Sequence, residues 1–396
     1  MIKYFLPLFI FFGNFLAIFG NETKVKLSDT KPDTGLIVST MVYYLGDQKY
    51  SLQISAYNFL DPKTAFVLLQ ELVPPTLKLD VKTFTTYESN SRTFSAVALE
   101  YPAAHTATFW QSTLNNWING TTPIYEDISI EYPVSQSPFP LNIAPLTMSR
   151  LINKENQLYA FFSNGEVHLI DLQKRQFVFQ YSLIPDSFQL DLSFMSFTSY
   201  GHLYDAGNDC VWSIAMAGIN AYLIKSSLTE KKVITSPTQL HLPNWDNQLI
   251  QGGFSTDGYI INMHLAQVED DKPPRIITIM TAFPGSGGVG FDMVEFLNTE
   301  TFTFEDINAN LMNDGIFFAC EESINSCDFL RNSAYDPVSK MLIFQGHLYS
   351  AEQSAGAAMI GFMPNKYDGS LTWYTGDYGN YAPFGLSGYQ WVQYIQ

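Results

Sequence analysis

The sequence predicts an all-β protein built from many short strands. Aromatic residues and charged residues each make up 15% of the 396 residues. Val, Ile, Phe, Tyr and Thr fill short apolar runs, which Gly, Pro, Asn and Asp separate. Helical periodicity is hard to find, and short β-branched and aromatic runs bounded by turn residues are typical of strands.

The stretch from residue 332 to 374 shows the repeating unit most clearly. A turn at Asp336-Pro337 precedes an apolar run at 341–349, and a second run at 358–363 leads to a last strand at 371–374. Four short strands separated by turns are typical of one blade of a β-propeller, in which four-stranded sheets repeat around a ring. Looser copies of this unit cover residues 36–80, 81–140, 146–190, 191–243 and 249–312.

These six units and a remnant predict one propeller domain over residues 21–396. We expect six or seven four-stranded blades and slightly prefer seven. The remnant, 382–396, contains a strand at 389–394 that could pair with the N-terminal strands and so remove the exposed sheet edges. Within 191–243 we expect separate strands at 192–197 and 201–204.

The rhythm of residues 156–162 followed by 165–172 is the best example of a family pattern. On this rhythm the chain resembles the broad superfamily of secreted β-propellers with degenerate YVTN and quinoprotein-type repeats. The resemblance covers nearly the whole chain, although no family signature is matched letter for letter. It implies the fold and a tendency to bind ligands across the ring, and it carries over no catalytic residue.

The N-terminal 20 residues are typical of a signal peptide. Lys3 precedes an apolar run at 4–19, and the small Gly20 marks a cleavage position before Asn21. The run is shorter than the ~20 residues of a spanning helix. Cleavage predicts a secreted protein or one in the lumen of a lysosome or vacuole, with no membrane attachment, and an uncleaved segment would be an anchor instead.

The acidic composition excludes one class of partner. Removal of residues 1–20 leaves 20 Lys+Arg against 38 Asp+Glu, because the full chain has 21 and 38 and loses only Lys3. The resulting net charge of −18 repels phosphate backbones, so we expect no nucleic-acid partner.

Three cysteines leave one unpaired in an oxidising compartment. Cys320 and Cys327 enclose a loop short enough to close as a local disulfide. We then expect Cys210 to be free and buried. A catalytic thiol is the alternative, and Asp209 argues against it because a thiolate needs a positive environment. Two Asn-x-Thr sequons, at Asn21 and Asn119, predict N-glycosylation, with Asn119 in the more turn-like stretch.

Histidines followed by leucine form the main candidate metal site. His202, His264 and His347 occupy similar places in their units, and acidic residues follow each of them. If equivalent positions gather on one face of the ring, three imidazoles could bind a divalent metal. If the histidines lie on second strands, they are too far apart, and each imidazole is satisfied locally. We therefore expect no obligatory cofactor.

Two further motifs have ordinary structural explanations. Residues 285–290 contain Gly-x-Gly-x-x-Gly after an apolar strand, but a dinucleotide site needs a helix to begin there. The following residues alternate like a strand, so we expect a hairpin loop. No Gly-x-Ser-x-Gly elbow occurs in the sequence, and no catalytic residue is assigned.

An aromatic segment near the C-terminus is the candidate binding surface. It is rich in Gly, Asp and Asn, which favours an exposed loop, and its candidate binding residues are Trp373, Tyr374, Asp377, Tyr378 and Tyr381. We expect a non-enzymatic module that binds a protein or glycan on one propeller face. The alternative is a hydrolase or lyase that uses channel carboxylates, with or without a His-bound metal.

Overall fold

The computed structural model describes strands and the turns that join them. It describes residues 36–46, 49–58, 61–73, 82–88, 91, 93–99, 106–113, 128–131, 148–184, 195–217, 220–241, 258–267, 273–282, 290–306, 316–320, 333–337, 340–350, 353–364, 371–376 and 389–392. Every regular element in these residues is a β-strand. No helix in this part of the chain is long and apolar enough to cross a membrane.

The strands group into antiparallel blades that follow chain order. Blade 1 contains β1 (Leu36–Gly46), β2 (Lys49–Asn58), β3 (Asp61–Val73) and the C-terminal β25 (Tyr389–Val392). Blade 2 contains β4 (Lys82–Glu88), β5 (Thr93–Leu99), β6 (Thr106–Thr113) and β7 (Ile128–Glu131). Blade 3 contains β8 (Met148–Lys154), β9 (Gln157–Phe162), β10 (Glu166–Asp171) and β11 (Gln176–Ser182).

The second half of the chain repeats this arrangement. Blade 4 contains β12 (Met195–Asp205), β13 (Cys210–Ala217), β14 (Asn220–Ser227) and β15 (Lys232–Gln239). Blade 5 contains β16 (Gly258–Ala266), β17 (Arg275–Ala282), β18 (Gly290–Asn298) and β19 (Thr303–Asp306). Blade 6 contains β21 (Ser333–Asp336), β22 (Met341–Ser350), β23 (Gln353–Pro364) and β24 (Leu371–Gly376), and β20 (Ile316–Cys320) pairs with both β18 and β22.

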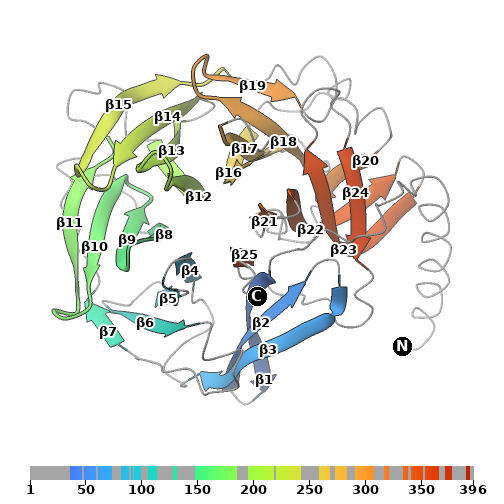
Figure 1. Ribbon diagram of the computed structural model, residues 1–396, viewed down its shortest axis with the longest axis horizontal. Helices are drawn as coiled ribbons and strands as arrows, with labels where there is room; N and C mark the ends of the chain where they lie inside the picture. Colours follow the sequence, from blue (N-terminus) through green and yellow to red (C-terminus); the bar gives the residue numbers. More distant parts are fainter. Residues whose placement is uncertain are drawn as a thin grey trace.

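The innermost strands of these blades form a closed ring (Figure 1). Going round the ring, β4 contacts β8, β8 contacts β12, β12 contacts β16, β16 contacts β21, β21 contacts β25, and β25 contacts β4. This arrangement confirms the predicted β-propeller. The described residues contain six blades, and the preference for seven stays a prediction.

The C-terminal strand closes the ring by pairing with the first strand of the chain. In the antiparallel register, Val392 lies opposite Leu36 and Tyr389 lies opposite Ser39. Blade 1 therefore takes its innermost strand from the C-terminus and its other strands from the N-terminus. This pairing confirms the predicted role of the remnant, and it covers the inner edge of β1.

Blade 4 differs from its prediction in one respect that matters for the site. Residues 195–205 form the single strand β12, whereas the sequence predicted separate strands at 192–197 and 201–204. The register of β12 against β13 shifts between Phe197 and His202, so the strand continues through an irregularity. His202 consequently lies on the innermost strand of its blade.

Three hairpin turns share one geometry although their residues differ. In three of the turns that join third to fourth strands, the last residue of one strand accepts a backbone N–H three residues later: Asp171 from Lys174, Ser227 from Glu230, and Asn298 from Thr301. The next residue has a positive φ in each case: 55° at Arg175, 53° at Lys231 and 58° at Phe302. This turn chemistry holds the hairpins in register.

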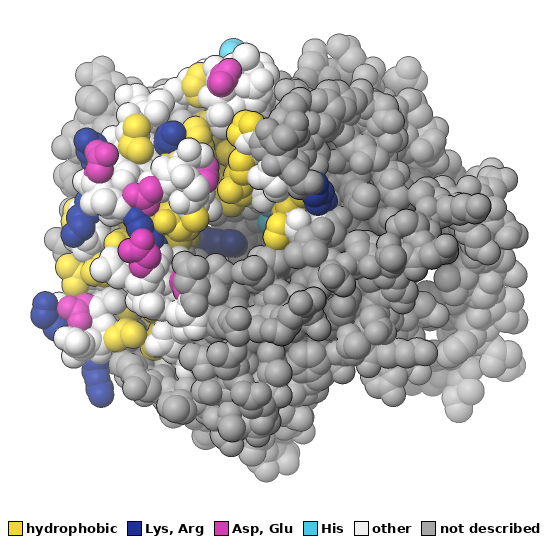
Figure 2. Space-filling model, viewed as in Figure 1, with side chains coloured by type: hydrophobic (Ala, Val, Ile, Leu, Met, Phe, Trp, Pro, Cys, Tyr) yellow, Lys and Arg dark blue, Asp and Glu magenta, His cyan; other side chains and the backbone are white. Residues whose placement is uncertain are grey.

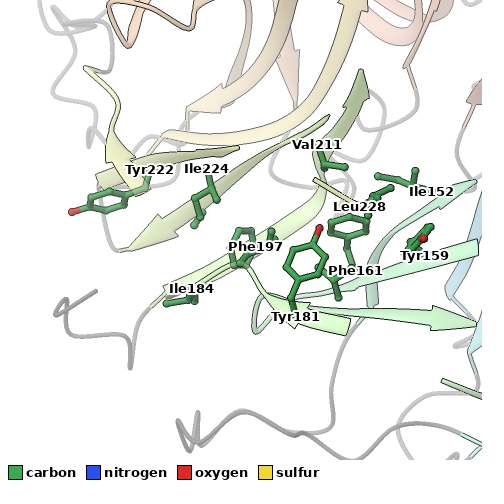
Figure 3. Packing of buried hydrophobic residues seen from close by; sticks show 13 residues of the cluster. Ile152, Tyr159, Phe161, Tyr181, Ile184, Phe197, Val211, Tyr222, Ile224 and Leu228 are labelled. Carbon is green, nitrogen blue, oxygen red and sulfur yellow. The ribbon is translucent and has the colours of Figure 1, made fainter. Parts of the chain in front are cut away.

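The described hydrophobic core lies in the wedges between blades. The largest cluster joins blades 3 and 4, and Figure 3 shows Phe161, Tyr181 and Phe197 side by side between their strands. Separate clusters join blade 2 to blade 3 and blade 4 to blade 5. Burial of one Phe or Leu side chain contributes about 1.5–3 kcal/mol, so these wedges hold neighbouring blades together.

Candidate functional site

A chain of hydrogen bonds centred on His202 joins blade 3 to blade 4. The Nε2 atom of His202 lies 2.8 Å from Oγ of Ser149, and the Nδ1 atom lies 2.8 Å from Oγ of Ser213. The Ser149 hydroxyl donates its only proton to the carbonyl of Phe161 at 3.1 Å. His202 therefore donates from Nε2–H to Ser149, and its Nδ1 accepts the proton of Ser213.

Ser149 and His202 have the spacing of a nucleophile and its base, but their environment is that of a structural pair. Their exposed fractions are 1% and 0%. The imidazole stacks on Phe197 at a ring distance of 5.3 Å and tilts over Phe161 at 4.7 Å. Burial, followed by the nearby charge of Arg150, lowers the pKa of His202 to about 3. The ring is neutral and closed to substrate, and Ser213 stands where a catalytic triad has a carboxylate.

His264 makes the corresponding contact between blades 5 and 6. Its Nε2 atom lies 2.7 Å from Oγ of Ser333, which belongs to the innermost strand β21. The side chain keeps some solvent exposure, unlike that of His202. Burial, followed by the charge of Arg150, also lowers the pKa of His264, to about 3.

Arg150 lies on the innermost strand β8, which neighbours β12 in the ring. It is partly exposed, and its charge lowers the pKa of both His202 and His264. Figure 2 shows one face of the molecule, on which Lys and Arg side chains of the described residues lie among acidic and hydrophobic ones. Sequence reasoning did not single out Arg150. The available signal was that Arg150 precedes a leucine, as the two histidines do.

The predicted metal residues are divided among three blades. His202 and His264 lie on the innermost strands of their blades, and not on second strands. His347 lies on β22, the second strand of blade 6. The side chain of His347 is outside the described residues. Within the described residues no group of three His, Cys, Asp or Glu side chains could hold a metal ion. The three-histidine site stays a prediction.

The predicted aromatic surface is only partly described. Trp373 and Tyr374 belong to β24, the last strand of blade 6, where their backbones pair with Phe362 and Gly361. Asp377, Tyr378 and Tyr381 lie outside the described residues. So do the signal peptide at 1–20, both sequons at Asn21 and Asn119, and Cys327 of the expected disulfide with Cys320.

Two other expectations are confirmed. Gly290 begins β18, which pairs antiparallel with β17, so a strand and not a helix begins at the last glycine of the motif, and residues 283–289 lie outside the described residues. Cys210 is a free cysteine with 0% exposure. Burial raises the pKa of its thiol to about 11, so the reactive thiolate is disfavoured.

The closed ring of four-stranded antiparallel sheets makes this protein a β-propeller. The sequence matches no protein-family model and no curated protein. The chain is similar in structure to the Dos1 propeller, with 9% identity, a TM-score of 0.42, and coverage of 74% of this chain and 61% of that chain. It is also similar to TolB from Acinetobacter baumannii, with 10% identity, a TM-score of 0.43, and coverage of 90% and 66%.

A third similar structure is a putative 6-phosphogluconolactonase from Bacteroides uniformis. The identity is 10%, the TM-score is 0.41, and the match covers 87% of this chain and 82% of that chain. This chain spans less than two thirds of the Dos1 and TolB chains that it resembles.

Proposed function

We propose that the protein is a non-enzymatic binding module that recognises a protein or a glycan on one face of the propeller. The observation that carries this proposal is the burial of the Ser149–His202 pair. The described contact that most resembles a catalytic pair ties two blades together, and its imidazole is already bonded at both nitrogens. A buried, saturated pair cannot receive a substrate.

The setting of this module follows from the N-terminal sequence. A cleaved signal peptide and glycans at Asn21 and Asn119 would make the protein a secreted or luminal glycoprotein. Its ligand would meet the aromatic segment that begins at Trp373 and Tyr374. Large aromatic faces can stack on sugars or on partner side chains.

The test compares binding with turnover in the same preparation. The secreted protein would be applied to a glycan array and to a panel of extracellular protein domains. We expect at least one ligand to bind saturably. Its affinity should fall about tenfold or more in the Trp373→Ala/Tyr374→Ala variant, because aromatic side chains contribute much of the free energy of binding. The Ser149→Ala variant should bind with unchanged affinity.

Turnover would overturn the proposal. The same protein would be assayed against chromogenic glycosides, esters and uronides. Hydrolysis or elimination that the Ser149→Ala variant loses, while it remains folded, would show that the buried pair opens to substrate and that the protein is an enzyme.

A further inference from the structure

One row of side chains in blade 2 is polar although it is buried. Thr86 on β4 lies directly opposite Ser95 on β5, and the two residues have exposed fractions of 7% and 0%. The next pair on the same face, Phe84 and Val97, belongs to the hydrophobic cluster that joins blades 2 and 3. Because alternate residues of a strand share a face, Thr86 and Ser95 also face the wedge between these two blades.

Asn153 faces the same wedge from blade 3. It lies near the end of β8, opposite Leu158 on β9, and Leu158 belongs to the cluster between blades 2 and 3. Directly opposite residues of an antiparallel pair share a face, so Asn153 points toward blade 2. The backbone N–H of Asn153 donates to Oγ1 of Thr86 at 3.2 Å. This bond places Asn153, which is 7% exposed, beside the pair of Thr86 and Ser95.

Three buried polar atoms of Ser95 and Asn153 have no hydrogen-bond partner within the described residues. They are Oγ of Ser95 and both Oδ1 and Nδ2 of Asn153. An exchange of the two amide atoms of Asn153 would not change this result, because both are unbonded. A buried polar group without a partner is unfavourable, since its bonds to solvent are lost on folding and not replaced. Three such atoms in one wedge indicate a ligand that bonds to them.

The chemistry of these atoms selects the ligand. In Asn153, Oδ1 only accepts and Nδ2 only donates, whereas the hydroxyl of Ser95 does both. A cation can bind Oδ1 but cannot accept a hydrogen bond from Nδ2, and an anion has the opposite defect. A neutral molecule that both donates and accepts satisfies all three atoms. The burial of both residues restricts this molecule to a very small one, and water has both properties.

We propose that the wedge between blades 2 and 3 is a binding site for internal water, which bonds to the carboxamide of Asn153 and to the hydroxyl of Ser95. Buried water typically makes about three hydrogen bonds to polar groups that are otherwise unsatisfied. A direct bond between Ser149 and His202 joins blades 3 and 4, whereas water-mediated bonds link blades 2 and 3. The inference does not depend on the ligand that the propeller face recognises.

A crystal structure of the wild-type protein, at a resolution that shows ordered water, tests the site directly. We expect water about 2.7–3.2 Å from both amide atoms of Asn153 and from Oγ of Ser95. The absence of density between these atoms would overturn the inference. Density with several oxygen neighbours at about 2.3–2.6 Å would also overturn it, because those distances are typical of bound Ca²⁺.

The direction of a stability change tests the same site in solution. If Ser95 bonds to water, Ser95→Ala should raise the equilibrium constant of unfolding by about 3–10-fold, because a hydrogen bond is lost. If the hydroxyl is unbonded in the native protein, its removal should lower that constant, since an unsatisfied group is no longer buried. Ser236→Ala, on the exposed part of β15, is the matched control and should change the constant by no more than about twofold. An unchanged or lower constant for Ser95→Ala in urea unfolding would overturn the inference.

Discussion

The imidazole Nε2 atom of His202 lies 2.8 Å from the hydroxyl oxygen of Ser149, and this contact joins the innermost strands of blades 3 and 4. Both side chains are buried, so water cannot replace either partner. The contact is therefore one of the polar links that hold the described part of the ring in register.

Removal of the Ser149 hydroxyl should destabilise the fold. In the Ser149→Ala variant the buried Nε2–H of His202 loses its acceptor, and we expect the free energy of unfolding to fall by about 1–3 kcal/mol. Urea unfolding measures this change. Ser236→Ala, on the exposed part of β15, is the matched control and should change stability by no more than about 0.5 kcal/mol. Equal stability of the two variants would contradict the assigned bond.

Stability should depend on pH through His202. The folded-state pKa of His202 is about 3, against an ordinary value of 6.5. Between these two pH values His202 is protonated in the unfolded chain and neutral in the folded chain. The free energy of unfolding should therefore fall as pH falls below 6.5 toward 3, by up to about 1.4 kcal/mol per pH unit. His264 acts in the same direction, because its folded-state pKa is also lowered to about 3.

Urea unfolding between about pH 7.5 and 5.5 isolates this effect, because the window lies above the ordinary carboxylate pKa values. The His202→Gln variant should show a flatter slope of stability against pH, and the exposed His241→Gln variant should keep the wild-type slope. A slope that His202→Gln leaves unchanged would show that other groups cause it.

Gly165 should tolerate no side chain. Its φ is +87°, and an added Cβ would lie 2.8 Å from Cε2 of Phe197 and 3.3 Å from Cγ1 of Ile184. Backbone strain and overlap together should make Gly165→Ala less stable by at least about 2 kcal/mol, measured by thermal unfolding. Gly207→Ala is the control, because its nearest neighbour would be Oδ1 of Asp205 at 3.4 Å, an ordinary contact.

Loss of β25 should open the ring. A chain that ends at residue 388 lacks the strand that pairs with β1, so the inner edge of blade 1 is exposed. We expect a lower thermal midpoint and faster hydrogen exchange in β1 and β2 than in a chain that ends at residue 392. Identical exchange in the two chains would show that β25 does not close the ring in solution.

The thiol of Cys210 should be unreactive in the native protein. It is buried, and its pKa is raised to about 11. In the native protein at neutral pH, Cys210 should react only slowly with a thiol reagent. After denaturation without reductant, the reagent should label one thiol, that of Cys210, if Cys320 and Cys327 form a disulfide. Three thiols after denaturation would rule out the predicted disulfide.

Local sequence was sufficient for blade 3. Strands β9 and β10 begin and end within one residue of the runs 156–162 and 165–172, because each is a short apolar run that ends at a turn whose residues tolerate the required backbone angles. The all-β class and the pairing of the C-terminal strand with the N-terminal strands also followed from the pattern, since a ring of blades needs a partner for its last strand.

Blade 4 shows where local reasoning failed. The segment between Phe197 and His202 resembles a turn, but packing against blade 3 and pairing with β13 keep it in one irregular strand. The sequence alone therefore left open whether His202 and His264 lie near the axis, and it did not connect them with Arg150.

The sequence by itself determined the fold class, the approximate strands and the buried state of Cys210, because these depend on residue type and on neighbours along the chain. The tertiary structure decided what the histidines do. Hydrogen bonds from His202 to Ser149 and from His264 to Ser333 join residues 53 and 69 positions apart. Only the closure of the blades into a ring brings such residues within bonding distance and removes the water that would otherwise compete.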